Sequence, residues 1–419
     1  MTREEATAGW ETAETVAKAW RAARSVVPPG LLDAAGCNVP SDRTFDAVVA
    51  HLRLERERGG YAAEPDLTPA RSALAALVEA EPADVAFAES GTAAMAALLG
   101  GWRLPPGSRV GFARTEYGST LMLLRRLAAE RGWKLVELPV DDDSRIDLDG
   151  LRSVLAAGLD LVSVVHVASH RGVVQPAAEI GALCRAAGVP LVLDVCQSLG
   201  QVHAGGVGAT VYVGTSRKWL AGPRGVGFLI VPGLTAEMDA AVPTLGGHVW
   251  AAGTRARRAL PDEPSPPVGA AGSEPPPLGV AGDEPSPRPG AIRYEGAEGG
   301  IAARIALGVA VQEHQALGPA AVHAHLAGLG GMARRVLDGA GGWRVVEPLD
   351  EPSALVTLKP PQGGSADDVR SRAARAGLLV GAAPVARAPL DLREPVLRVS
   401  PPPGTPAETL QALARLLES

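Results

Sequence analysis

The chain has 419 residues, more than one hydrophobic core usually organises, so its length favours two domains. Its net charge is −6 without a long basic run, which argues against a nucleic-acid or membrane-surface partner. No apolar run approaches the roughly 20 residues that span a bilayer, and the N-terminus has no apolar signal region; we therefore expect a cytoplasmic protein.

The first 20 residues predict an amphipathic helix, because Trp10 and Trp20 lie nearly three helical turns apart. From Val85 onward, short β-branched runs alternate with longer Ala- and Leu-rich stretches, which is typical of an α/β domain with a mostly parallel sheet. The runs are apolar at consecutive positions, as expected of strands covered on both faces. Strands are predicted at residues 85–90, 109–114, 134–140, 161–169, 190–197, 210–214 and 227–231.

The composition changes after about residue 250. Residues 261–290 are rich in proline, glycine and glutamate, cannot bury apolar surface, and predict a disordered insertion. Beyond the insertion, strands and helices alternate in a pattern that suits a smaller α+β domain. The expected organisation is an N-terminal segment that packs with the small domain (1–64), a large domain (65–253), the insertion (254–292) and the small C-terminal domain (293–419).

Polar residues follow several of the predicted strands, at the edge where open α/β sheets bind ligands. Ser90, Gly91 and Thr92 begin a helix, whose free N–H groups and dipole favour an anion, although taken alone they read as a plain helix cap. Asp194 ends a strand, where a carboxylate is costly unless it has a partner. Lys218, one of four lysines in the chain, follows the next strand.

An anion site, a strand-end carboxylate and a strand-end amine together match what pyridoxal phosphate (PLP) requires of a protein. A lysine holds this cofactor as an imine and, once displaced by substrate, can move protons. A carboxylate keeps the pyridine nitrogen protonated, so that the ring can accept electrons. Asp194 and Lys218 are separated by one short crossover and can converge at the same sheet edge.

The order of these residues resembles that of the class V aminotransferase-fold PLP enzymes, which have fold type I. The resemblance implies a large domain with a mostly parallel seven-stranded sheet, a smaller α+β C-terminal domain, an amino-acid substrate, and a homodimer with active sites at the interface. It extends from about Leu31 to the C-terminus and rests on Ser90-Gly91-Thr92, Tyr117, Asp194 with Gln197, Thr215-Ser216-Arg217-Lys218, and Arg398.

The resemblance assigns a role to each of these residues. Lys218 would carry the cofactor, and Asp194 would pair with the pyridinium nitrogen. Gln197 would hydrogen-bond to the ring hydroxyl and Tyr117 would stack on the ring, although Tyr117 alone could be ordinary packing. Arg398 would bind the substrate α-carboxylate bidentately, although alone it could be a surface-strand arginine. The remaining cofactor-binding residues would be Ser90, Gly91, Thr92, Thr215 and Arg217.

Within this family the chain is most similar to the hercynylcysteine sulfoxide lyases of ergothioneine biosynthesis and their relatives in lincosamide pathways. The similarity implies β-elimination that cleaves a cysteine C–S bond, in ergothioneine or antibiotic metabolism. His170 and Arg171 replace a small polar pair in the substrate-facing loop and predict a more anionic or bulkier substrate. Glu298 stands where many relatives have Thr or Ser. The similarity lies in residues 59–64, 171–201, 214–229 and 301–311.

Other readings stay open. A decarboxylating oxidative deaminase, an epimerase or an aminotransferase could use the same residues, whereas a non-catalytic binding module would not need both Lys218 and Asp194. A cysteine desulfurase would need a nucleophilic cysteine in residues 378–390, which contain none. The isolated cysteines exclude a disulfide framework or a CxxC zinc site, and Cys196 reads as a small buried hydrophobe. Scattered histidines such as His166, His203 and His248 predict no metal site.

Overall fold

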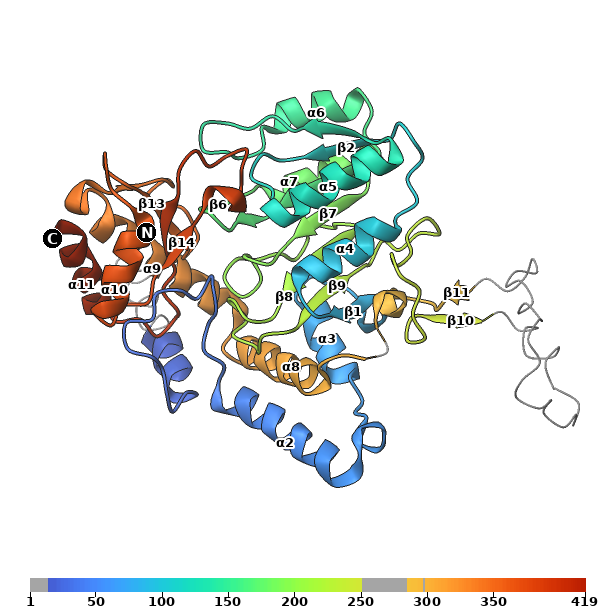
Figure 1. Cartoon of the computed structure of the whole chain (residues 1–419), viewed down its shortest axis with the longest axis horizontal. Helices are drawn as coiled ribbons and strands as arrows, with labels where there is room; N and C mark the ends of the chain where they lie inside the picture. Colours follow the sequence, from blue (N-terminus) through green and yellow to red (C-terminus); the bar gives the residue numbers. More distant parts are fainter. Residues whose placement is uncertain (1–13, 251–284, 297) are drawn as a thin grey trace, which may run out of the picture.

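The fold is described from a computed structural model that covers residues 14–250, 285–296 and 298–419 (Figure 1). A seven-stranded sheet forms the large domain, in the order β1-β9-β8-β7-β4-β2-β3. β9 runs antiparallel to its neighbours β1 and β8, and the other pairings are parallel. The predicted mostly parallel seven-stranded sheet is therefore confirmed. The strands are β1 (Val85–Ala88), β2 (Arg109–Phe112), β3 (Lys134–Glu137), β4 (Leu161–Val165), β7 (Leu191–Asp194), β8 (Val211–Thr215) and β9 (Gly227–Ile230).

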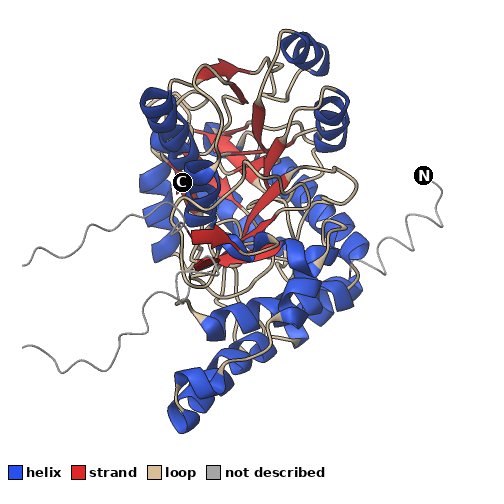
Figure 2. Ribbon diagram, turned by 90° about the vertical axis from the view of Figure 1, so that its right-hand side faces the viewer, coloured by secondary structure: helices blue, strands red, loops and turns tan. Residues whose placement is uncertain are grey.

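Helices cover both faces of this sheet, which explains why its strands are apolar at consecutive positions (Figure 2). In β4, for example, Val162 and Val164 face one hydrophobic cluster and Leu161 faces the other. The first cluster receives α3 (Thr68–Ala76), α6 (Leu148–Ala156), α7 (Ala177–Ala186) and α8 (Ile301–Ala316). The second receives α4 (Gly91–Gly101) and α5 (Gly118–Arg131).

The small domain is a four-stranded antiparallel sheet in the order β12-β13-β15-β14, packed against helices, as the sequence predicted. β14 was not predicted, because its sequence Gly-Ala-Ala has no β-propensity. The elements are α9 (Pro319–Leu337), β12 (Arg344–Val345), β13 (Val356–Lys359), α10 (Ala366–Arg375), β14 (Gly381–Ala383), β15 (Val396–Val399) and α11 (Ala407–Glu418).

The N-terminal segment connects the two domains. Residues 14–22 are helical and bury Trp20, while Trp10 lies outside the described residues. The backbone of Leu32 then pairs with the small domain, donating to Leu379 O at 2.9 Å and accepting from Ser400 N at 2.7 Å. By contrast, α2 (Asp42–Arg58) packs on α8. None of the described helices is both long and apolar enough to cross a membrane.

Most of the predicted insertion, residues 254–292, lies outside the described residues, but its last part is ordered. β11 (Pro285–Pro287) pairs with β10 (His248–Trp250), and η3 (Ala291–Tyr294) follows. The prediction of disorder therefore does not hold for residues 285–292, where Ala291 buries its side chain in the large-domain core. Tyr294, just beyond the predicted insertion, is buried in the same core. Since α8 also packs on that core, the large domain includes residues that the sequence placed in the small one.

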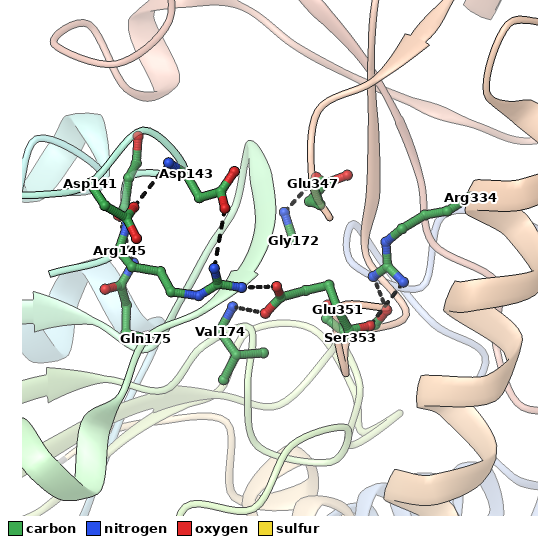
Figure 3. A network of polar contacts seen from close by, with 11 residues as sticks. Asp141, Asp143, Arg145, Gly172, Val174, Gln175, Arg334, Glu347, Glu351 and Ser353 are labelled. Atoms are coloured by element: carbon green, nitrogen blue, oxygen red, sulfur yellow. Dashed lines mark hydrogen bonds and ion pairs between the residues drawn. The ribbon is translucent and has the colours of Figure 1, made fainter. Parts of the chain in front are cut away.

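The predicted strand at 161–169 ends early and continues as a hairpin of β5 (Val167–Ala168) and β6 (Arg171–Val174). This hairpin docks on the small domain. Gly172 N donates to Glu347 Oε1 at 2.7 Å, and Val174 N donates to Glu351 Oε1 at 2.7 Å (Figure 3). A Cβ on Gly172 would lie 1.8 Å from Leu355 O, so only glycine allows this close approach.

The network around Glu351 extends the contact between the domains (Figure 3). Its carboxylate forms an ion pair with Arg145 of the large domain, and its backbone O accepts from Arg334 Nη1 at 2.9 Å. The pKa of Glu351 is raised, because the effect of burial outweighs the lowering by the hydrogen bond from Val174 N and by the charge of Arg145. The two domains are thus joined by a partly buried ion pair, and removing Arg145 would leave the charge of Glu351 buried without its ion-pair partner.

Three histidines that are distant in sequence lie together where α8 meets α9. The ring centroids of His314 and His323 are 5.7 Å apart, and those of His203 and His323 are 6.5 Å apart. Burial lowers the pKa of His314 and of His323 to about 4. Within the described part of the chain, no group of three or more His, Cys, Asp or Glu side chains could hold a metal ion.

This histidine cluster makes the stability depend on pH. The unfolded chain takes up protons on His314 and His323 near pH 6.5, whereas the folded chain resists until about pH 4. The free energy of unfolding therefore falls as the pH falls between these values, by up to about 3 kcal/mol per histidine. In urea titrations from pH 7 to 4, the double variant His314→Gln, His323→Gln should show a flatter pH dependence. An unchanged slope would contradict this account.

Candidate active site

A cavity opens at the carboxyl edge of the large sheet, where the ends of β1, β2, β4, β7 and β8 meet. It contains about 640 Å³ of space free of protein atoms, including its open mouth. Most of the residues that the sequence singled out line it together. Its walls are Ser90, Gly91, Thr92, Thr115, Tyr117, Thr120, Val165, Val167, Ser169, Asp194, Cys196, Gln197, Thr215, Arg217 and Lys218.

Lys218 reaches this cavity from a tight turn after β8. The turn is closed by Ala221 N, which donates to Lys218 O at 2.9 Å, and Ala221 adopts a left-handed φ of 54°. Burial lowers the pKa of the Lys218 amine to about 8, although the nearby Cys196 and Asp194 raise it. A substantial fraction of the amine is therefore neutral at mildly alkaline pH, which is the form that attacks a carbonyl.

Asp194 ends β7 beside the lysine. Its Oδ1 accepts from Cys196 N at 2.8 Å, which fixes the carboxylate at the cavity wall. Glu116 lies nearby and is completely buried; burial raises its pKa well above the ordinary value, and the charge of Asp194 raises it further. Both effects favour the protonated form of the Glu116 carboxyl group. Sequence analysis missed it, although its place directly before Tyr117 was a usable signal.

The start of α4 forms the opposite end of the cavity. Ser90 Oγ accepts from Ala93 N at 3.1 Å, which caps the helix and leaves the N–H groups near its start available to an anion. Gly91 is required here, because a Cβ would lie 2.7 Å from Cys196 Sγ. Gly227 of β9 is required for the same reason, since its Cβ would lie 2.1 Å from the carbonyl carbon of Ser90.

Gln197 and Arg217 line the cavity but also bind the N-terminal segment. Gln197 Nε2 donates to Ala35 O at 3.0 Å, and its Oε1 accepts from Trp219 Nε1 at 2.9 Å. Arg217 donates to the carbonyl oxygen of Gly36. The N-terminal segment therefore orients two residues that were predicted to contact a cofactor.

Arg398 projects from the middle of β15 toward the same region. Its Nη2 donates to Asp33 Oδ1 at 2.8 Å, and its Nη1 donates to the backbone O of Ser169, a cavity residue, at 3.2 Å. Its Nε is buried and has no hydrogen-bond partner among the described residues. A Cβ on Gly381, the β14 residue opposite, would lie 3.1 Å from that Nε. Arg398 thus keeps free donors for a carboxylate.

The structure does not bring His170 and Arg171 to this cavity. His170 is buried, and its Nε2 lies 2.7 Å from Asp391 Oδ2, while Arg171 Nε lies 3.3 Å from the same oxygen. Burial alone would raise the pKa of Asp391, but the hydrogen bond from His170 and the charge of Arg171 bring it below its usual value. Both side chains line a separate cavity on the other side of the β5–β6 turn.

The residues around Lys218 fit PLP. The cavity offers an amine of lowered pKa, a carboxylate 24 residues earlier in the chain, and a helix N-terminus with hydroxyl and guanidinium groups for a phosphate. The close packing at Gly91 and Gly227 holds the start of α4 against Cys196 and β9.

Comparison with known proteins agrees with this fit. Residues 55–264 match the family described as aminotransferase class-V. A probable hercynylcysteine sulfoxide lyase of Mycobacterium tuberculosis is 39% identical over 413 residues, which cover 96% of this chain and 93% of that protein. The chain belongs to the class-V aminotransferase family. A cysteine desulfurase IscS of Proteus mirabilis is 31% identical over 45% of this chain and 47% of that protein.

Solved structures share the fold of this chain. The apo cysteine desulfurase of Thermococcus onnurineus has a TM-score of 0.77 at 18% identity and covers 94% of this chain and 98% of that one. The cystine C–S lyase C-DES, in complex with cysteine persulfide, has a TM-score of 0.76 at 20% identity and covers 93% of this chain and 97% of that one. PLP is the cofactor of this class-V aminotransferase-family chain, while the roles of its individual residues stay predictions.

The first of these roles to test is that of Lys218. Purified Lys218→Ala protein should lose the visible absorbance of a lysine-bound cofactor and should resist borohydride labelling. Lys134→Ala removes an exposed lysine on β3 and is the matched control, which should keep both signals. Mass analysis of the borohydride-treated peptides checks the attachment point. A label on any other lysine would contradict the assignment.

The position of Arg398 can be tested through its neighbour Gly381. Gly381→Ala places a methyl group 2.8 Å from Asp33 Oδ1 and 3.1 Å from Arg398 Nε, so we expect this ion pair to shift. The KM for the amino-acid substrate should then rise at least about tenfold, the effect of losing about 1.4 kcal/mol of carboxylate binding. Gly328→Ala lies on α9 with nothing near the added methyl group and is the control. An unchanged KM in Gly381→Ala would argue against the assignment of Arg398.

Proposed function

We propose that this chain cleaves a cysteine S-conjugate by β-elimination and releases a thiol or sulfenate, pyruvate and ammonia. The chain is a PLP-dependent C–S lyase of the class-V aminotransferase family. What supports the finer reaction is the small-domain segment that packs beside the cavity, where Ala386 contacts Gly118, the residue after Tyr117. Residues 378–390 contain no cysteine that could take up the sulfur, as a desulfurase requires.

The cysteine that does line the cavity is a poor sulfur acceptor. Cys196 packs against the start of α4, and burial raises the pKa of its thiol well above the ordinary value, as does the charge of Asp194. Since the thiolate is the nucleophilic form of cysteine, Cys196 stays unreactive at neutral pH. The sulfur of the substrate therefore leaves with its substituent and is not captured by this thiol.

The proposed reaction uses the cavity residues as follows. Arg398 binds the α-carboxylate, which directs the α C–H bond toward Lys218. The Lys218 amine takes the α-proton, the C–S bond breaks, and its electron pair leaves with the sulfur. Bound PLP supplies the electron sink that makes this proton acidic, and Asp194 keeps its ring nitrogen protonated. The released aminoacrylate takes up water and gives pyruvate and ammonia.

The assembly and setting belong to the same proposal. We place the reaction in ergothioneine or antibiotic metabolism, in the cytoplasm. The relative at 39% identity, a probable hercynylcysteine sulfoxide lyase, supports a cysteine S-conjugate as substrate. A homodimer is supported by large apolar side chains that stay exposed on α2 and in residues 242–250. They are Phe45 (63% exposed), Leu52 (52%), Val242 (69%), Leu245 (73%) and Trp250 (58%).

Incubation with a panel of cysteine S-conjugates, followed by mass analysis of all products, tests the reaction. We expect one pyruvate and one ammonia for each thiol or sulfenate released, without oxygen consumption. The rate should fall by at least about a thousandfold in Lys218→Ala, because both the proton acceptor and the cofactor attachment are lost. Aldehyde and carbon dioxide with oxygen uptake would instead indicate decarboxylating oxidative deamination. Amino transfer or inversion without C–S cleavage would also contradict β-elimination.

A further inference from the structure

Arg387 is a cation without a partner close to the candidate active site. It lies in η5 (Val385–Arg387) of the small domain. Its side chain forms no hydrogen bond or ion pair with the part of the chain that the structure describes, and its Nε is buried and unpaired. The side chain as a whole is half-buried, but a buried donor without a partner is costly, so the position of this Nε calls for a physical explanation.

Two contacts hold the Arg387 segment against the large domain. The start of α5 approaches it so closely that a Cβ on Gly118, the residue after Tyr117, would lie 2.1 Å from Ala386 O. Four residues beyond Arg387, Asp391 accepts from Ser144 Oγ at 2.8 Å and lies 2.7 Å from His170 Nε2. Arg387 is therefore carried by a fixed part of the structure and not by a free loop.

The charges near Arg387 leave an excess of positive charge. Burial lowers the pKa of Arg387, and the charges of Arg398 and Arg217 lower it further, while Tyr117 and Asp33 act in the opposite direction. Asp33 already forms an ion pair with Arg398 at 2.8 Å. Asp33, the carboxylate that acts on Arg387, is thus already paired with another arginine, an arrangement that an anionic ligand would stabilise.

Two of these three cations already have an expected anion. Arg217 lines the cavity at its phosphate end, and Arg398 keeps donors for the α-carboxylate of the substrate. Neither assignment accounts for Arg387. Tyr117, which is predicted to stack on the cofactor ring, lines the cavity, and the next residue, Gly118, packs against Ala386. A substituent that extends from the reacting carbon past Tyr117 therefore approaches the segment that carries Arg387.

We propose that Arg387 binds an anionic group on the S-substituent of the substrate, so that this site selects cysteine S-conjugates that carry a second negative charge. This inference rests on the proposed C–S lyase reaction for the identity of the substrate. A guanidinium suits the task because its planar fork can bind a carboxylate through two hydrogen bonds. Arg387 is then a specificity-determining residue and takes no part in breaking the bond.

The test compares S-(carboxymethyl)cysteine with S-(carbamoylmethyl)cysteine, which are nearly equal in size and differ by one negative charge. With the holoenzyme, Arg387→Gln should raise the KM for the carboxymethyl substrate at least about tenfold and change that for the carbamoylmethyl substrate less than about twofold. Arg387→Lys should restore part of the difference. Arg375→Gln removes an exposed arginine from α10 and should leave both values unchanged.

A binding measurement separates this inference from the proposed reaction. Calorimetric titration of PLP-loaded Lys218→Ala protein, with and without Arg387→Gln, gives the Kd of each conjugate without turnover. We expect Arg387→Gln to remove the preference for the carboxymethyl conjugate. If it weakens both conjugates equally or neither, the role of Arg387 is overturned while the lyase reaction stands. If the unmodified enzyme cleaves no conjugate but the charge preference depends on Arg387, the reaction is wrong and the anion site remains.

Discussion

The amine of Lys218 is buried at the carboxyl edge of a parallel sheet, where loss of water lowers its pKa to about 8. Several parts of the chain surround the amine, while the cavity keeps an open mouth. β8 ends at the amine, α4 begins beside it, and the N-terminal segment binds Gln197 and Arg217 through backbone carbonyls. The small domain completes the enclosure by placing Arg398 over the same edge.

The large sheet and the residues at its edge could be predicted because both depend on local sequence. Apolar runs identify strands, and polar residues directly after a strand, such as Asp194, must lie at its carboxyl end. β14 could not be found in this way, since Gly381 and its alanine neighbours have no strand preference of their own. Glu116 stands directly before the predicted site residue Tyr117, but only the fold shows that its carboxyl group is buried close to Asp194.

The residue proposed to recognise the S-substituent of the substrate could not be predicted from the sequence. His170 and Arg171 differ from the family pattern and were therefore predicted to contact substrate, but their side chains bind Asp391. That contact joins residues 221 positions apart, and no local pattern reveals such a pairing. Through Asp391 the pair anchors the segment that carries Arg387. The carboxylate of Asp391 thus links His170 and Arg171 to the segment of Arg387, which is proposed to bind the substrate.

The pairing of Leu32 with Ser400 has a consequence for how the protein is made. On the ribosome, at about 5–20 residues per second, the N-terminal segment emerges roughly 20–70 seconds before its β15 partner exists. During that interval the large-domain sheet can form, but Leu32 has no small-domain core to enter and Arg398 is not yet available to Asp33, 365 residues earlier. The nascent chain therefore exposes this apolar segment to chaperones until synthesis is nearly complete, and the substrate-binding half of the site is assembled last.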